Sequence, residues 1–332
     1  MGLFDFFKKT SEPPKNNTPP PALSDREKYG QAWQQIVFYN KAKGLQTMKE
    51  LSESGFLEAT IVLAMFSDSE SERKTLYKKA ADLNHPEGLW GYAAQMQHSF
   101  IPDPDNPADV EWEATCLKAA EMGSVDAMNE MGNIFNRRQD YAQSMYWYTL
   151  ANINDHPAGG VSVAGIAKKW LAAGMPRVFN ESAHFNLAQY KCAIFYLEMW
   201  AGQQTTTPIN ELITMTLDGE PLAAYLTGDI FENAGNTEMA YKMYNAIAFE
   251  NDPHGLKCYG DMLYRGIGVE KDIQGALRAF TLAAEGGDRA AMFAVGQMTQ
   301  YNNRNLAAYW FGVAHTRGYQ PALLALRQLA QR

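Results

Sequence analysis

A pattern of small residues at a fixed spacing recurs along the chain and limits its possible folds more than any other feature. In each copy, Ala or Gly is followed four residues later by a larger residue and five residues later by Gly or Ala. These positions share one face of an α-helix, and Gly inside a helix costs about 1 kcal/mol relative to Ala. The recurrence therefore predicts helices that pack closely through this face. The second small residue of each copy is Ala64, Ala93, Gly132, Ala193, Gly228, Gly260 or Gly296.

A second helix is expected after each copy, and proline marks the start of the next unit. Segments such as 76–81, 116–120 and 280–284 have helical spacing of apolar residues. Because proline lacks an N–H and has a fixed φ, it is tolerated at the first position of a helix. The repeating unit is therefore predicted to be helix, turn, helix. The prolines at these restarts are Pro86, Pro157, Pro221, Pro253 and Pro321.

The spacing of the copies predicts how the chain is divided. A chain of 332 residues is long enough for two domains or one repeat array, and the recurrence favours one array. Gly132 and Ala193 are much farther apart than the other neighbouring copies. We therefore expect an irregular unit or hinge at 154–181, between an N-terminal part of the array at 23–153 and a C-terminal part at 182–332.

Residues 1–22 are predicted to be a flexible arm with a short apolar tip. Five prolines follow Lys8 within this segment, which favours an extended, solvated tether. Its basic residues follow the apolar ones, the reverse of a secretory signal, and no apolar run is long enough to be a transmembrane segment. Two interpretations of the tip stay open: it is unstructured, or it docks weakly on a partner, a membrane surface or the protein's own groove. The tip residues are Leu3, Phe4, Phe6 and Phe7.

Charge and cysteine usage narrow the class of partner and the compartment. The net charge is −8, from 37 acidic and 29 basic residues, so there is no basic surface for nucleic acid. This favours protein or peptide partners and no nucleic acid. Cys116, Cys192 and Cys258 are widely separated and lack CxxC spacing, which indicates neither disulfides nor a zinc site. A cytoplasmic location is therefore predicted.

Residue patterns typical of active sites are not found. Gly266 and Gly268 lack the spacing of a phosphate-binding loop and are predicted to form a turn that ends a helix. The six histidines are assigned no metal-ligand partner, and His254 is interpreted as a turn residue beside proline. Cys192 and Cys258 occupy the large apolar position of the repeat, where burial favours an inert thiol. We predict no catalytic residue, cofactor or metal, and a protein that is not an enzyme.

One unit of the chain resembles a known repeat. The segment 255–269, followed by Asp272, Ala276, Phe280 and residues 283–287, closely resembles a unit of the Sel-one-like repeat family, which belongs to the tetratricopeptide-like α/α solenoids. The resemblance implies an all-α fold, a right-handed superhelical solenoid of helix-turn-helix repeats that acts as a scaffold or adaptor. It also implies that the first helix of each unit lines a concave surface. Shortened units of this kind lie at 56–93, 113–152, 223–249 and 288–314.

A candidate binding groove follows from positions on the first helix of each unit. Residues three before, one after and four after the repeated Gly or Ala share one helix face. Aromatic side chains can anchor a partner there, and amides can bond to its main chain. The polar members are taken as a sign that this face is open, while core packing is the alternative for each aromatic. The predicted partner-binding groove comprises Trp90, Asn129, Asn133, Tyr225, Asp229, Lys257, Asp261, Tyr264 and Gln297.

Three functions are compatible with this sequence. The leading hypothesis is a non-catalytic scaffold or adaptor that binds a partner protein or peptide in the concave groove. The alternative is an inhibitor or immunity-type protein that blocks a toxic enzyme, since an acidic surface suits a basic target. A hydrolase with no recognisable motif is the least favoured of the three.

Overall fold

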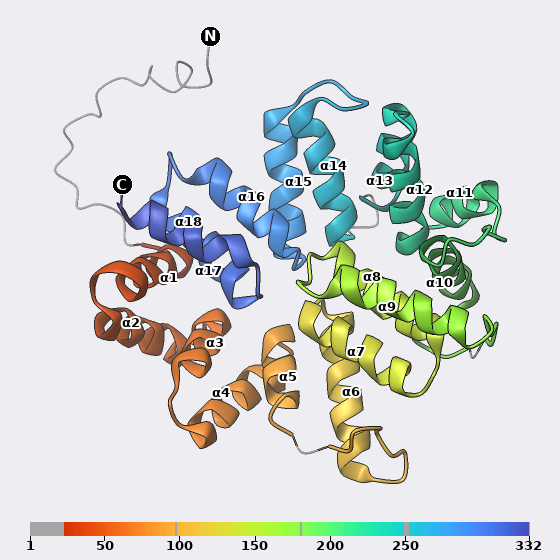
Figure 1. The fold of residues 1–332 in the computed structure, drawn as a ribbon. Coiled ribbons are helices and arrows are strands. Elements are labelled where there is room, and N and C mark those ends of the chain that lie inside the picture. The colour runs from red at the N-terminus through yellow and green to blue at the C-terminus, as the bar shows by residue number, and fades with distance from the viewer. Residues whose placement is uncertain (1–22, 97, 180, 249–251, 332) are drawn as a thin grey trace.

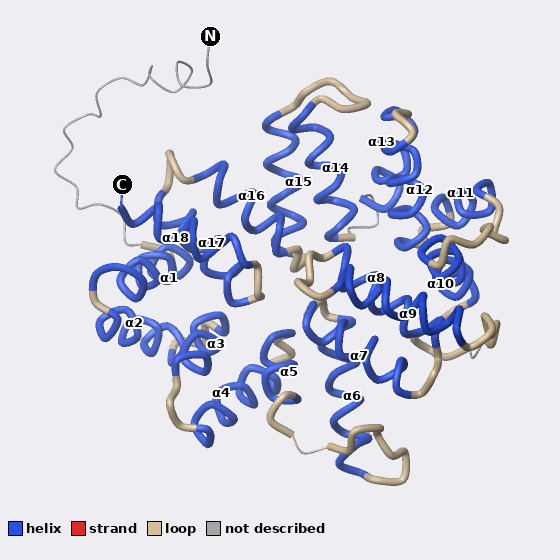
Figure 2. The backbone as a smooth tube through the Cα atoms, in the orientation of Figure 1, coloured by secondary structure: helices blue, strands red, loops and turns tan. Residues whose placement is uncertain are grey.

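The computed structural model describes residues 23–331 except residues 97, 180 and 249–251. These residues form eighteen α-helices and one short π-helical segment in succession (Figure 1). Strands are absent from this part of the chain (Figure 2). No helix within it combines the length and hydrophobicity needed to cross a membrane. The predicted arm at 1–22, with Leu3, Phe4, Phe6 and Phe7, lies outside the described residues.

The helices are short, and most begin at a residue whose side chain caps the helix. They are α1 (Asp25–Gln34), η2 (Gln35–Tyr39), α2 (Lys41–Glu53), α3 (Leu57–Phe66), α4 (Glu70–Asp82), α5 (Pro86–Ala93), α6 (Pro107–Glu121), α7 (Val125–Arg137), α8 (Tyr141–Ile153), α9 (Gly159–Ala172), α10 (Leu187–Trp200), α11 (Ile209–Leu217), α12 (Pro221–Asn233), α13 (Thr237–Ala248), α14 (Pro253–Arg265), α15 (Ile273–Glu285), α16 (Arg289–Thr299), α17 (Arg304–Thr316) and α18 (Gln320–Gln331).

Almost every helix packs against its neighbours in the chain, α10 and α11 being the exception, and the array curves until its last helices meet its first (Figure 1). α1 packs along α17 and also contacts α18. The fold is therefore an all-α repeat array that closes into a ring. The repeat pattern predicted the helical array, but it did not predict that the two ends would meet.

The contact between α1 and α17, which we call the seam, is very close. A Cβ placed on Gly30 would lie 1.9 Å from the backbone oxygen of Asn305, and one on Gly312 would lie 2.3 Å from the Trp33 ring. The Gln34 side chain donates a hydrogen bond to the Asn305 side chain over 3.2 Å. Glycines on both sides thus let the two helices approach where larger residues would hold them apart.

Glycines at the repeat position face an aromatic ring on the following helix. A Cβ on Gly132 would lie 2.4 Å from the Tyr148 ring, and one on Gly228 would lie 2.3 Å from the Tyr244 ring. The prediction that these glycines mark close helix packing is confirmed, because the ring occupies the space a side chain would need. The same contact joins Gly260 to Phe280 and Gly296 to Phe311.

The packing changes around α9. α10 contacts α8 as well as α9, and between α9 and α10 the described residues form no helix. This stretch is held by the buried carboxylate of Glu198, which forms an ion pair with Arg177 and accepts a hydrogen bond from the Thr206 backbone N–H over 2.8 Å. It overlaps the segment 154–181, whose role as a hinge between two parts of the array stays a prediction.

Candidate functional site

A cleft of 680 Å³ lies between the α6–α8 part of the ring and the N-terminal ends of α10, α12, α14 and α16. Each of these four helix ends contributes its N-cap residue to the cleft lining. The cleft is therefore a product of the ring curvature, which brings together helix ends that are far apart in the sequence. The four N-cap residues are Asn186, Glu220, Asp252 and Asp288.

Three of these N-caps are carboxylates, and capping explains why acids stand at these positions. Each accepts a hydrogen bond from a backbone N–H in the first turn of its helix, and a negative charge there interacts favourably with the helix dipole. As a result, three acidic side chains line one side of the cleft. The bonds run from Leu222 N to Glu220 at 3.2 Å, from Gly255 N to Asp252 at 2.7 Å and from Ala291 N to Asp288 at 2.7 Å.

Aromatic side chains form much of the remaining lining. Tyr146 packs edge-on against Phe185, with ring centroids 5.5 Å apart, and accepts a hydrogen bond from the Gln189 side chain over 3.2 Å. Trp147 and Tyr225 are buried in the cleft wall. The cleft thus combines flat apolar surfaces with carboxylates at its edge.

Tyr225 connects the aromatic lining to the carboxylates. Its hydroxyl donates a hydrogen bond to Oδ1 of Asp252, and its ring lies edge-on to His254 with centroids 4.8 Å apart. Burial raises the pKa of Tyr225 well above its usual value, so it stays a hydrogen-bond donor. Of the two interpretations left open for Tyr225, exposed anchor or core packing, the structure favours packing: its ring is a buried part of the cleft wall.

His254 has partners that the sequence analysis missed. Its Nε2 lies 3.4 Å from the Cys258 sulfur on the same helix, and its Nδ1 lies 3.5 Å from Oδ2 of Asp288. Burial lowers the pKa of His254, but Cys258 and Asp288 raise it more, to about 10. The Asp288 carboxylate therefore favours the protonated form of the His254 ring. The four-residue spacing of His254 and Cys258 was the available signal.

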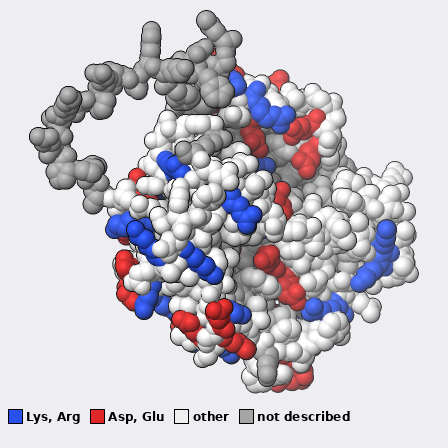
Figure 3. Space-filling view, turned by 60° about the vertical axis from the view of Figure 1, so that its left-hand side comes forward, with Lys and Arg blue, Asp and Glu red and all other residues white. Residues whose placement is uncertain are grey.

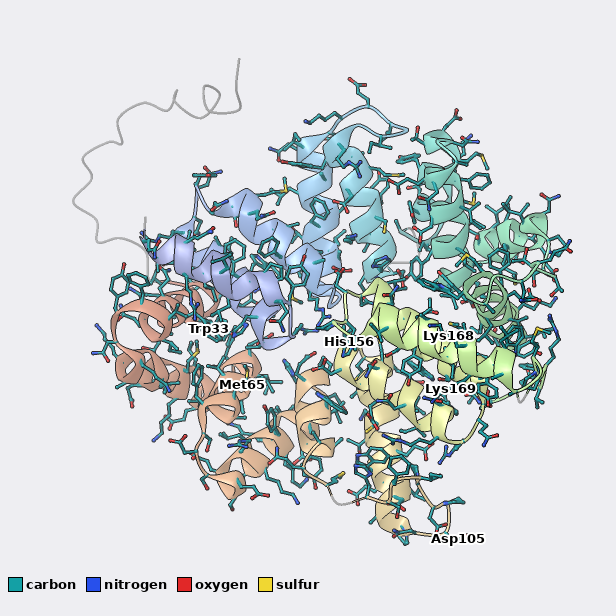
Figure 4. All side chains as sticks on the ribbon, in the orientation of Figure 1. Trp33, Met65, Asp105, His156, Lys168 and Lys169 are labelled. Carbon is teal, nitrogen blue, oxygen red and sulfur yellow. The ribbon has the colours of Figure 1, made fainter. Side chains whose placement is uncertain are left out.

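The buried side chain of Arg289 bonds to two backbone carbonyls near one end of the cleft. Arg289, which is 2% exposed, donates from Nε to the Asn154 carbonyl over 2.9 Å and from Nη1 to the Arg317 carbonyl over 2.6 Å. Nearby, His156 lies 3.3 Å from Asp126, and Figure 4 shows His156 facing the middle of the ring. Because Asn154 and the Asp288 cap both line the cleft, Arg289 connects its two sides.

Two polar residues of the predicted groove each accept a hydrogen bond from a tyrosine of their own unit. Tyr148 donates a hydrogen bond to Asn133, and Tyr244 donates one to Asp229, each over 2.7 Å. In both units the acceptor directly follows the glycine that the tyrosine ring covers. Asp229 is exposed and Asn133 is half-buried, so a role of these two side chains in binding a partner stays a prediction.

The other predicted groove residues lie outside the cleft, and Tyr225 alone of the nine lines it. Trp90 is half-buried against the core, and the Asn129 side chain accepts a hydrogen bond from Ser162 over 3.4 Å. Lys257 forms an ion pair with Asp261 at 3.3 Å. Tyr264 and Gln297 are exposed. A partner-binding role for this set stays a prediction.

The cleft acids gave one sequence signal that the repeat pattern concealed. Glu220 and Asp252 each stand directly before a proline that restarts a unit. On the face shown in Figure 3, acidic side chains lie along the central hollow of the molecule. Within the described ranges, no three His, Cys, Asp or Glu side chains come together in a way that could hold a metal ion.

Comparisons with known proteins give a distant likeness. No family model and no curated protein matches the chain. Among solved structures, it is similar to a protective antigen of uropathogenic Escherichia coli strains with an SLR fold, at 16% identity and a TM-score of 0.37, covering 92% of this chain and 87% of that one. It is also similar to a Sel1 repeat protein from Oxalobacter formigenes, at 16% identity and a TM-score of 0.38, covering 96% and 93%.

Proposed function

We propose that this protein is a non-catalytic scaffold or adaptor that binds a segment of a partner protein in the cleft. The observation that carries the proposal is the cleft itself, in which buried aromatic rings adjoin carboxylates from separate helices. Its volume is within the usual range of ligand sites, which pair apolar surfaces with a few directed polar groups. A cytoplasmic location stays a prediction.

Two features support a binding role rather than a catalytic one. The Cys258 sulfur packs beside the apolar cluster of Ala240, Tyr244 and Met262, between α13 and α14, and is not part of the cleft lining. Three of the four carboxylates in the cleft are engaged as helix caps. A rigid lining of this kind is suited to recognition, because little side-chain entropy is lost when a partner binds.

The test is to fill the cleft without removing any of its contacts. Met122 lines the cleft and is 37% exposed, while Met65 is 40% exposed on α3, in another part of the ring (Figure 4). Met65 directly follows the repeated Ala64 and so lies on the helix face that the sequence analysis predicted as the groove. Met65→Trp is therefore a matched control that tests this face.

Partners are captured from the native cell with each full-length variant and quantified by mass spectrometry. Met122→Trp should reduce capture of the partners at least about tenfold, the effect of losing a binding hot spot, while Met65→Trp should leave it unchanged. If only Met65→Trp reduced capture, the site would lie on the predicted groove face instead. Unchanged capture by both variants would reject the cleft.

A further inference from the structure

Glu220 and Asp252 differ from the other acids of the cleft because, among the described residues, neither has a basic side chain beside it. Glu121 contacts His184, and Asp288 lies 3.5 Å from Nδ1 of His254. Within the described part of the chain, neither Glu220 nor Asp252 forms an ion pair. Two of the four cleft carboxylates therefore lack a counter-charge.

The two acids line the same cleft and are linked through α12, because Glu220 caps this helix and Tyr225 in it bonds to Asp252. Burial raises the pKa of Glu220, and the Asp252 carboxylate raises it further. Their hydrogen bonds are one-sided: Leu222 N binds Oε1 of Glu220, while Tyr225 and Gly255 N both bind Oδ1 of Asp252. Among the described residues, no donor binds the second oxygen of either carboxylate. Like charges in a partly buried site favour the binding of a cation between them.

The neighbouring rings narrow the kind of cation. Tyr146 and Phe185 line the same cleft as the two carboxylates, and the Tyr225 hydroxyl bonds to Asp252. Planar guanidinium groups stack on aromatic faces and donate in several directions at once, whereas an ammonium is compact and strongly hydrated. Two carboxylates on separate helices beside aromatic rings match a guanidinium better than an ammonium.

We propose that the cleft recognises an arginine side chain of the partner, held between Glu220 and Asp252 beside the aromatic wall. This inference rests on the proposed function, since it names the chemistry that the same cleft would bind. The occupant is an arginine-containing peptide segment, and charge complementarity is the ground for it.

The test uses the full-length protein and small probes. Nα-acetyl-arginine amide is titrated in parallel with Nα-acetyl-citrulline amide, which has nearly the same shape but no charge, and with Nα-acetyl-lysine amide. Methyl-labelled methionines report binding by NMR, because Met122 and Met128 line the cleft and Met65 lies elsewhere. The arginine compound should shift the Met122 and Met128 signals and bind at least about tenfold more tightly than either alternative.

Matched variants locate the charge. In Glu220→Gln/Asp252→Asn both side chains keep an oxygen that can cap the helix, and binding of the arginine compound should fall at least about tenfold. Glu50→Gln/Glu53→Gln makes the same change of charge at exposed positions of α2 and should have no effect. Circular dichroism confirms that each variant is folded.

Each contrary result overturns the inference. Equal affinity for the citrulline or lysine compound would reject arginine recognition, as would the absence of shifts at Met122 and Met128. Undiminished binding to the Gln/Asn variant would reject the two carboxylates. Capture by Met122→Trp is read separately, so arginine recognition can fail while the cleft remains the partner site.

Discussion

Two regions of the ring use the same contact in different ways. Within the unit of α7 and α8, Gly132 faces Tyr148, and that tyrosine bonds to Asn133 beside the glycine. At the seam, Gly312 faces Trp33 from the opposite end of the array. The unit contact is local in sequence, and its ring hydroxyl bonds beside the glycine, whereas the seam joins distant helices through buried aromatic packing and the separate Gln34–Asn305 hydrogen bond. A local contact can form early and repeat, while the seam requires a nearly complete ring.

The strongest test of the comparison is to separate the seam. In Gly30→Ala the new Cβ would lie 1.9 Å from the Asn305 oxygen, a backbone atom that cannot rotate away. We expect the free energy of unfolding to fall by about 3 kcal/mol, measured by urea denaturation, with helix content retained. Gly165→Ala is the control: it has open space within α9 and should gain about 1 kcal/mol. Equal effects would mean that the seam is not tightly packed.

A smaller loss is expected inside a unit. In Gly132→Ala the new Cβ would meet the Tyr148 ring at 2.4 Å, but a side chain can shift where a backbone cannot. The expected loss is about 1–2 kcal/mol, again from urea denaturation. In a double-mutant cycle with Tyr148→Leu, the two losses should not add, because the clash disappears with the ring. Additive losses would show that the clash lies elsewhere.

Removing only the polar anchor should have a smaller effect again. Tyr148→Phe keeps the ring over Gly132 but leaves Asn133 without its hydroxyl donor. The melting temperature should decrease modestly, corresponding to about 1 kcal/mol. Asn133→Ala should produce a similar loss, and the double variant should be little worse than either alone. If the double variant lost the sum of the two single losses, Tyr148 and Asn133 would contribute to stability independently.

The smallest expected effect is a pH dependence of the seam. His315 on α17 lies edge-on to Trp33 with centroids 5.5 Å apart, and burial, together with Arg327, lowers its pKa. The stabilising contribution of a neutral His315 is therefore present above its unfolded pKa of about 6.5 and is lost as pH falls below that value. Urea denaturation between pH 7 and about 5 should show a smaller loss for His315→Leu than for the native chain. An equal loss would place the acid sensitivity elsewhere.

The sequence predicted the contacts between helices that follow each other in the chain. Gly132, Gly228, Gly260 and Gly296 could be recognised because each contact repeats the same local spacing. The seam could not, since Trp33 and Gly312 belong to no common pattern and meet only when the whole array curves round.

The candidate site was only partly predictable for the same reason. The tyrosines that donate to Asn133 and Asp229 lie on the following helix, so local spacing does not predict these hydrogen bonds. Glu220 and Asp252 are recognisable as helix caps, but nothing local indicates that the two caps converge on one cleft.

In the closed ring, the two ends of the array pack against each other. The Tyr39 hydroxyl donates a hydrogen bond to the Ala330 carbonyl over 2.8 Å, so the first and last helices are neighbours in space. An open stack exposes two apolar faces that need polar capping units, whereas here each terminal helix shields the other. In a closed ring the packing depends on the order of the repeat units and less on the position of the chain ends. A circular permutant is therefore expected to form the same ring.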